Sequence, residues 1–267
     1  MVFNKSGILA VLLIVIVADS VCAENAKEVV VSSAKELKGI KAKKITWKKD
    51  GAKMVRIPWI SSYTKYGDPN FEPFYMDTTE VTVGQFKKFL KDTGYEPEEP
   101  IDWAELYKYS PTDKHPMIMV NWHHATAYAK WASKRLPTND EWEFAARGGL
   151  VNKSFPWGDG IEIAQSYAHS KVSFMKDNNS KWDLMTAPVG SFKPNGYGLY
   201  DMAGNVWEWC DAWHIFSKQT ARVFRGGSWR EGLFVLDYLH EENFWHAKGS
   251  PLTYRDNLGF RCVVGSK

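Results

Sequence analysis

The chain has 267 residues, 44% of them hydrophobic, and a formal net charge of +3. This length suits one large globular domain or two small ones. Eight lysines gather between residues 35 and 53, but no arginine and only one aromatic residue, Trp47, accompany them. This pattern is typical of a solvated segment and argues against a nucleic-acid-binding protein.

Residues 1–23 have the layout of a secretory signal. Lys5 gives a positively charged start, residues 7–18 are apolar, and residues 21–23 form a small-residue pattern suited to cleavage after Ala23. An uncleaved membrane anchor is the alternative, although the apolar core is short for a bilayer span of about 20 residues. We expect an exported protein, periplasmic or secreted, with no membrane span once the signal is cleaved.

The rest of the chain divides near residue 45. Residues 24–45 are polar and lysine-rich, which predicts a linker, and residues 46–267 are expected to form one domain. Within that domain, residues 54–59 alternate like a strand, and residues 74–82 contain a second β-rich run.

Three helices are expected next. Residues 83–93 have apolar positions at helical spacing behind a capping Thr82, and residues 123–134 repeat that spacing. Thr138 and Glu141 form a capping box that opens a third helix, which two glycines end. Beyond residue 150, frequent Gly, Pro, Asn and aromatic residues predict short strands and long ordered loops.

Two cysteines follow the signal, Cys210 and Cys262. In an exported protein they can form a disulfide or stay buried as thiols, and the spacing leaves both possibilities open. A disulfide closing a loop of about 50 residues would stabilise the fold by roughly 4 kcal/mol. Neither cysteine has the CxxC spacing of a redox dithiol.

Several motifs occur in an order typical of one family. They are MDTTEVTVGQF (76–86), the run 120–149 ending in LPTNDEWEFAARGG, FPWGD (155–159), the run 186–213 containing GNVWEWC, RVFRGGSW (222–229) and NLGFRC (257–262). Together they resemble the formylglycine-generating-enzyme family, also called sulfatase-modifying factors. The resemblance covers about residues 50–265, nearly all of the chain after the signal.

The resemblance implies an α+β fold, the formylglycine-generating-enzyme variant of the C-type-lectin-like fold, with short strands, few helices and much ordered loop. The name-giving enzymes oxidise a sulfatase cysteine to formylglycine with O₂ and copper(I), which two cysteine thiolates hold. Other relatives run different chemistry or only bind ligands, so membership predicts the fold better than the function.

The copper-binding cysteines of these enzymes lie three and eight residues after the serine of the GGS motif. Counted from Ser228, those positions hold Glu231 and Leu236. Copper(I) prefers soft sulfur ligands, which a carboxylate and a leucine cannot replace. We therefore expect no copper thiolate site and no formylglycine-generating activity.

The segment 230–256 is where the family builds its active site or ligand groove. It is rich in acid–base and aromatic side chains, and it suggests either a metal or acid–base cluster or a solvated polar loop. The catalytic candidates are Glu231, His240, Glu241 and His246, and the candidate groove residues are Trp229, Arg230, Tyr238 and Trp245.

A calcium site is expected in the GNVWEWC region. Asp201, Gly204, Val206 and Glu208 occupy the positions that bind calcium in the family, through two side-chain oxygens and two backbone carbonyls. Calcium prefers six to eight hard oxygen ligands, including carbonyls. In the alternative interpretation, the two carboxylates only accept hydrogen bonds from N–H groups of that loop.

Three functions are consistent with these observations. The first is a calcium-stabilised binding protein without formylglycine-generating activity, whose ligand or protein partner the sequence does not name. The second is a non-copper oxidoreductase or tailoring enzyme that uses the groove at residues 230–246. The third is a structural component of an envelope complex.

Overall fold

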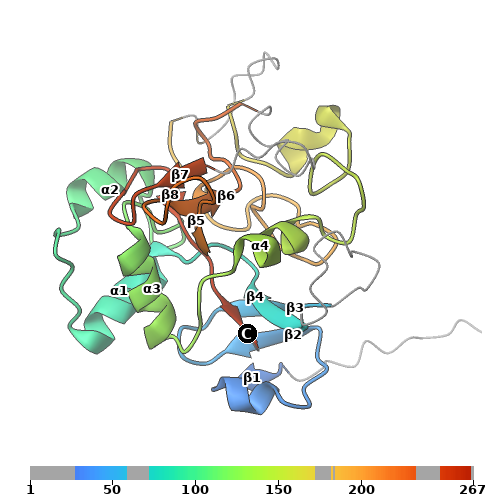
Figure 1. Cartoon of the computed structure of the whole chain (residues 1–267), viewed down its shortest axis with the longest axis horizontal. Helices are drawn as coiled ribbons and strands as arrows, with labels where there is room; N and C mark the ends of the chain where they lie inside the picture. The colour runs from blue at the N-terminus through green and yellow to red at the C-terminus, as the bar shows by residue number, and fades with distance from the viewer. Residues whose placement is uncertain (1–27, 59–71, 172–181, 183, 233–246, 266–267) are drawn as a thin grey trace, which may run out of the picture.

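The computed structural model describes residues 28–58, 72–171, 182, 184–232 and 247–265. Its regular structure is divided between two small sheets and a group of short helices joined by long loops (Figure 1). The strands are β1 (Val30–Val31), β2 (Lys44–Trp47), β3 (Lys53–Ile57), β4 (Phe74–Asp77), β5 (Trp207–Trp213), β6 (Arg222–Arg225), β7 (Ala247–Gly249), β8 (Leu258–Gly259) and β9 (Val263–Val264). The helices are α1 (Val83–Thr93), α2 (Trp103–Tyr109), α3 (Trp122–Trp131) and α4 (Asn139–Ala146), with 3₁₀ turns at Ala34–Leu37 and Ile161–Ser166.

The five-stranded sheet has the order β1-β2-β3-β4-β9. Its central strands pair antiparallel, and β9, at the C-terminal end of the described chain, lies antiparallel to β4 (Figure 1). The predicted strand at 54–59 is thus confirmed as β3, and the run at 74–82 begins with β4. The sheet joins the two ends of the domain, because β1 and β9 form its opposite edges.

The linker predicted for residues 24–45 is wrong for its described part. β1 pairs in parallel with β2, and the carbonyls of Val29 and Val31 accept hydrogen bonds from Thr46 and Lys48 at 2.9 and 2.8 Å. Val31 is completely buried in a small cluster with Trp47. The lysines that follow it are exposed to solvent. Because the segment contains so many lysines, the sequence analysis did not recognise the short apolar strand that completes the sheet.

The four-stranded sheet carries the motif run at residues 204–229. Its order is β7-β6-β5-β8, with β5 and β6 antiparallel and β8 parallel to β5. Helix α4 packs on β5 and β6, and α1 packs against α3 at the side of the molecule (Figure 1). Trp209 of β5 lies edge-on to Phe224 of β6, with ring centroids 5.2 Å apart, and is completely buried.

Two of the predicted helices begin at the capping residues that the sequence analysis named. Thr82 and Thr138 each accept a hydrogen bond from the backbone N–H three residues on, and each makes a full capping box. The helix predicted at 123–134 spans Trp122–Trp131. The sequence analysis missed α2, which Asp102 caps through its side chain. None of the helices in the described ranges is long and apolar enough to cross a bilayer.

Of the two possibilities that the sequence left open for the cysteines, the disulfide is not formed. Cys210 and Cys262 are both free thiols, fully buried. They belong to different apolar clusters: Cys210 lies in the cluster that contains Trp142, whereas Cys262 lies in the cluster that contains Tyr128. Burial raises the pKa of both thiols, which keeps them protonated and unreactive.

Candidate functional site

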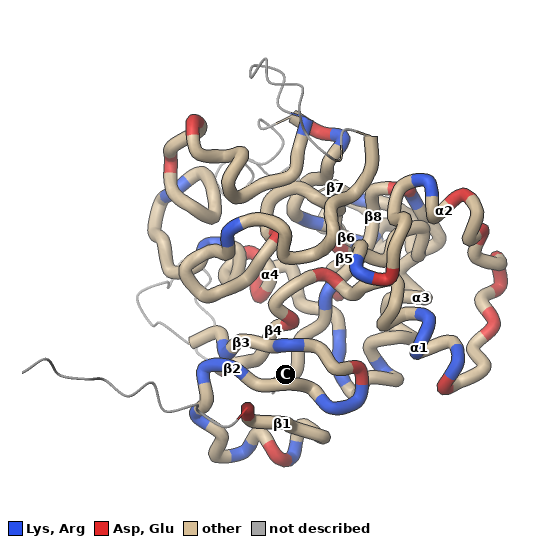
Figure 2. The backbone as a smooth tube through the Cα atoms, turned by 180° about the vertical axis from the view of Figure 1, so that it is seen from behind, with Lys and Arg blue, Asp and Glu red and all other residues tan. Residues whose placement is uncertain are grey.

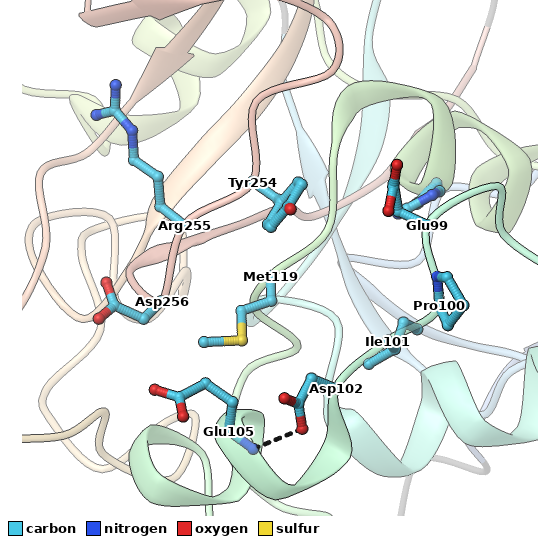
Figure 3. Close-up of a pocket in the computed structure, with 10 residues that line it drawn as sticks. Glu99, Pro100, Ile101, Asp102, Glu105, Met119, Tyr254, Arg255 and Asp256 are labelled. Carbon is cyan, nitrogen blue, oxygen red and sulfur yellow. Dashed lines mark hydrogen bonds between the residues drawn. The ribbon is translucent and has the colours of Figure 1, made fainter.

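A pocket of about 430 Å³ opens beside α2. Three segments that are distant in sequence form it: the loop that leads into α2, the residue Met119 before α3, and residues 254–256 (Figure 3). Figure 3 shows the Met119 side chain between Asp256 on one wall and Asp102 on the other. A volume of this size suits a small molecule or a peptide side chain.

Local geometry holds the three walls together. Asp102 caps α2, and its Oδ1 accepts a hydrogen bond from the N–H of Glu105 at 3.0 Å. Met119 adopts the left-handed backbone conformation, with φ of 55°, and its N–H donates to the carbonyl of Arg255 at 2.9 Å. This conformation is costly for a residue with a long side chain, and such strain collects at binding and active sites.

His124 gives the pocket a hydrogen-bond donor. The residue is 4% exposed, and burial lowers its pKa, so the ring is neutral at pH 7. Its Nδ1 accepts the N–H of Asn121 at 3.4 Å, which places the ring proton on Nε2. The ring lines the pocket, with Nε2–H as its remaining donor.

Carboxylates dominate the rim. Glu99, Asp102, Glu105 and Asp256 line the pocket together with one arginine residue, Arg255. Figure 2 shows acidic positions following one another along the loop between α1 and α2, which forms one side of this rim. The pocket therefore presents a negative potential to solvent.

Two of these carboxylates already have a partner. Glu105 forms an ion pair with Lys108 at 2.5 Å, and Asp256 forms one with Arg230. Arg255 is directed away from the pocket, toward the Phe224 ring at 5.3 Å (Figure 3). Within the described part of the chain, Glu99 and Asp102 form no ion pair and can meet a ligand.

The predicted groove residues Trp229 and Arg230 border this pocket. Trp229 stacks on Tyr109 at the end of α2, with ring centroids 6.0 Å apart, and Arg230 lies over the Trp229 ring at 4.8 Å. The ion pair of Arg230 with Asp256 joins this aromatic stack to the pocket wall. The other two groove candidates, Tyr238 and Trp245, lie outside the described residues.

Glu231 is held in place by hydrogen bonds. Its carboxylate accepts from the Ser228 hydroxyl and, at 3.3 Å, from the Asn257 side-chain amide, which also donates to Ser228 at 2.9 Å. These contacts join the GGS motif to the NLGFRC motif. The other catalytic candidates, His240, Glu241 and His246, fall outside the described residues.

The predicted calcium residues are buried in the loop that leads into β5 and at the start of that strand. Glu208 is fully buried, and its two oxygens accept hydrogen bonds from Arg261 at 2.7 Å. The indole N–H of Trp142 also donates to Glu208, at 2.7 Å. Gly204, in the left-handed conformation, donates its N–H to the carbonyl of Gly226, and Val206 is fully buried.

Asp201 lies beside another acid that the sequence analysis did not identify. Asp201 adopts φ of 57°, and its Oδ2 accepts the N–H of Gly190 at 2.7 Å. Burial raises the pKa of both Asp201 and Glu80, and the charge of Asp201 raises the pKa of Glu80 further. Among the described residues, no three His, Cys, Asp or Glu side chains are arranged to hold a metal ion. A cation here would therefore need backbone oxygens as well.

The sequence analysis also missed the pocket. It named neither His124 nor Met119 as a candidate site residue. The acidic loop 96–102 was the available signal, because four carboxylates in seven residues beside an aromatic helix indicate a cation-binding surface. Nothing in the sequence placed residues 254–256 opposite that loop.

Comparison with known proteins agrees with the motif order. Residues 51–265 match the sulfatase-modifying factor enzyme 1-like domain. The chain is 32% identical to a formylglycine-generating enzyme of Bos taurus over 72% of its own length and 66% of the relative. It is 30% identical to the inactive C-alpha-formylglycine-generating enzyme 2 of the same organism, over 73% of its own length and 78% of the relative. A formylglycine-generating enzyme of Streptomyces coelicolor is 39% identical, over 56% of this chain and 52% of the relative.

Solved structures show the same fold. PvdO from Pseudomonas aeruginosa superposes with a TM-score of 0.60 at 25% identity, over 82% of this chain and 97% of the other. Variable protein 1 of Treponema denticola gives a TM-score of 0.59 at 23% identity, over 83% and 98%. The fold is thus the predicted α+β arrangement of formylglycine-generating enzymes. Since the family domain spans most of the chain, this protein belongs to the sulfatase-modifying factor family.

Proposed function

We propose that this chain is a binding member of its family without formylglycine-generating activity, and that the pocket beside α2 accepts a cationic group. The observation that carries the proposal is the acidic lining of the pocket, in which Glu99 and Asp102 form no ion pair within the described part of the chain. An ammonium or guanidinium group attached to a small molecule or a peptide has the matching charge.

The state of the cysteines and of Glu231 supports the absence of copper chemistry. Copper(I) needs thiolates, and the two described thiols are buried with raised pKa values. The position of the first copper cysteine holds Glu231, whose carboxylate binds Ser228 and Asn257. The position of the second copper cysteine holds Leu236.

A sulfatase-type CxPxR peptide tests both parts of the proposal. Because the peptide carries an arginine, we expect it to bind, and we expect its cysteine to be unchanged by mass spectrometry after incubation with copper and O₂. A second peptide with citrulline in place of arginine keeps the size and loses the charge, so it should bind more weakly. Formation of formylglycine would refute the absence of activity. Equal affinity for the two peptides would refute the cationic pocket.

Asp102→Asn isolates the charge of the pocket from its structure. Asparagine caps helices as well as aspartate does, so α2 should be retained while one negative charge is lost. For a partly exposed pair, about 1 kcal/mol of attraction is lost, which is an approximately fivefold weaker Kd for the arginine peptide. Asp113→Asn is the matched control, because Asp113 is exposed, pairs with Lys87 and does not line the pocket.

Calcium binding and export are separate proposals. Bound calcium would stabilise the framework around Asp201, so the melting temperature should be higher in the presence of calcium than in the presence of a chelator.

The proposal that the protein is exported rests on residues 1–23, and it predicts a mature protein that begins at Glu24. N-terminal sequencing of protein from a periplasmic or secreted fraction tests it, and recovery of the full-length chain from the cytoplasm would contradict it.

A further inference from the structure

Another pocket lies against the five-stranded sheet, which Figure 1 shows well away from α2. It has a volume of about 690 Å³ and shares no lining residue with the pocket beside α2. Its walls are residues 28–29 before β1, residues 42–46 around β2, residues 53–54 of β3, Thr78, and the loop residues Gly198 and Tyr200. A cavity of this size is within the range of small-molecule sites.

Backbone hydrogen bonds fix these walls relative to one another. The carbonyl of Val29 accepts the N–H of Thr46 at 2.9 Å, which holds the chain before β1 against β2. Thr78 donates its N–H to the carbonyl of Lys53 at 2.8 Å, and its own carbonyl accepts the N–H of Tyr200 at 2.9 Å. The folded backbone itself therefore forms the pocket.

Much of this pocket lies outside the family domain. The match to that domain begins at residue 51, whereas residues 28–29 and 42–46 precede it. The sequence analysis regarded this region as a lysine-rich linker. Because the region pairs with the sheet through β1 and β2, its lysines are held on a defined surface (Figure 2).

The lining has an excess of positive charge. Lys43, Lys44 and Lys53 line the pocket with one acid, Glu28. Glu28 forms an ion pair with Lys53, whose Nζ also donates to Thr46 Oγ1 at 2.8 Å. Lys43 and Lys44 are exposed and form no ion pair within the described part of the chain. Two ammonium groups are therefore available to an anion.

Most of the remaining lining is apolar, from Val29, Ala42, Ile45 and Met54. Thr78 and Tyr200 add two hydroxyl groups, and neither hydroxyl has a hydrogen-bond partner among the described residues. Hydrocarbon walls with a few polar groups and two unpaired cations suit an anion that is carried on an apolar body.

We propose that this pocket binds a small amphiphilic anion, a hydrocarbon chain that ends in a carboxylate or a phosphate. The ammonium groups of Lys43 and Lys44 neutralise the oxyanion, the hydroxyl of Tyr200 donates a hydrogen bond to it, and the apolar walls cover the chain. This site does not depend on the proposed peptide pocket or calcium site, so its failure would leave both of those proposals standing.

Four probes separate the head group from the chain. Octanoate and octyl phosphate carry both parts, octanamide lacks the charge, and inorganic phosphate lacks the chain. In titration calorimetry we expect at least one octyl anion to bind roughly tenfold or more tightly than octanamide and inorganic phosphate, and the tighter anion identifies the head group. Its affinity should fall as salt is added. Equal affinity for octanamide or for inorganic phosphate, or no binding by either octyl anion, would overturn the proposal.

The double variant Lys43→Gln/Lys44→Gln tests the location. Both side chains are exposed, so the circular dichroism spectrum and Tm should match wild type, while the preferred octyl anion should bind roughly tenfold or more weakly. Lys35→Gln/Lys48→Gln is the matched control, because it removes the same charge from exposed lysines of the same region that do not line the pocket. The control should change the affinity less than about twofold.

Tyr200→Phe removes only a hydroxyl and keeps the ring. It should weaken binding of the same anion roughly three- to tenfold, the effect of one lost hydrogen bond. If the control pair weakens binding as much as the pocket pair does, the anion binds the lysine-rich surface at large and the pocket is not the site. Unchanged affinity in Lys43→Gln/Lys44→Gln would overturn the proposal directly.

Discussion

Lys134→Met tests the strongest buried electrostatic feature of the fold. The Lys134 ammonium lies between Asp50 Oδ2 at 2.8 Å and Asp77 Oδ1 at 2.6 Å, and none of the three side chains is more than 3% exposed. Asp50 also accepts the hydroxyl of Tyr128 at 2.9 Å. The triad joins the turn after β2 and the end of β4 to the residues after α3.

The expected loss in the free energy of unfolding follows from the two carboxylates that remain buried in the variant. Methionine fills a similar volume but leaves two buried carboxylates without a counter-charge, and breaking a buried pair in this way costs about 3–5 kcal/mol. Proton uptake limits the cost. Neutralising one carboxyl at pH 7 costs about 1.4 kcal/mol for each unit between its ordinary pKa and the solution pH, or roughly 4 kcal/mol. We therefore expect a loss of about 4–5 kcal/mol at pH 7.

The loss should shrink in acid. Burial, with the charge of Asp50, already raises the pKa of Asp77 to about 6 against the opposing effect of Lys134, and removal of the lysine raises it further. A carboxyl whose folded-state pKa is raised favours folding below its unfolded pKa, and this contribution is lost as the pH rises. Between pH 7 and about pH 6, where Asp77 of the wild type is still largely ionised, the loss should shrink by about 1.4 kcal/mol per pH unit for each acid that takes up a proton in the variant.

Urea unfolding of wild type and variant at pH 5, 6 and 7 measures this difference. Lys88→Met is the control, because Lys88 is half-exposed and pairs with Asp92 one helical turn away. It should cost about 0.5 kcal/mol or less at every pH. A loss below about 1 kcal/mol for Lys134→Met at pH 7, or one that does not change with pH, would refute the reasoning.

Three other predictions concern the buried framework. Cys210 and Cys262 should not react with a thiol reagent in the folded protein and should both react in guanidinium; rapid labelling of the native state would contradict their burial. Thr138→Ala should cost about 1 kcal/mol by urea unfolding through loss of the α4 cap, and an unchanged midpoint would argue against the capping box. Gly204→Ala should reduce the yield of folded protein severely, because its Cβ would overlap the carbonyl oxygen of His169 at φ of 84°; a circular dichroism spectrum and Tm equal to wild type would contradict this.

Several features could be predicted from the sequence because they depend on interactions between residues close together in the chain. A cap involves residues three apart, so Thr82 and Thr138 marked their helices without knowledge of the rest of the fold. Asp102 and Glu105 carried a similar signal for α2, which the sequence analysis overlooked because the helix is only seven residues long. The first strand was missed for another reason: two apolar residues among many lysines indicate burial only when a partner strand is known.

By itself, the sequence determined the family and the α+β fold, because the order of the motifs is a property of the chain alone. Only the tertiary structure determined which buried charged side chains contact which partners. Glu208 precedes Arg261 by more than fifty residues, and Glu80 precedes Asn205 by more than a hundred, yet each pair is joined by a hydrogen bond. The pocket likewise depends on Met119 meeting residues 254–256. Contacts between such distant segments follow from how the whole chain packs, and local pattern does not encode that packing.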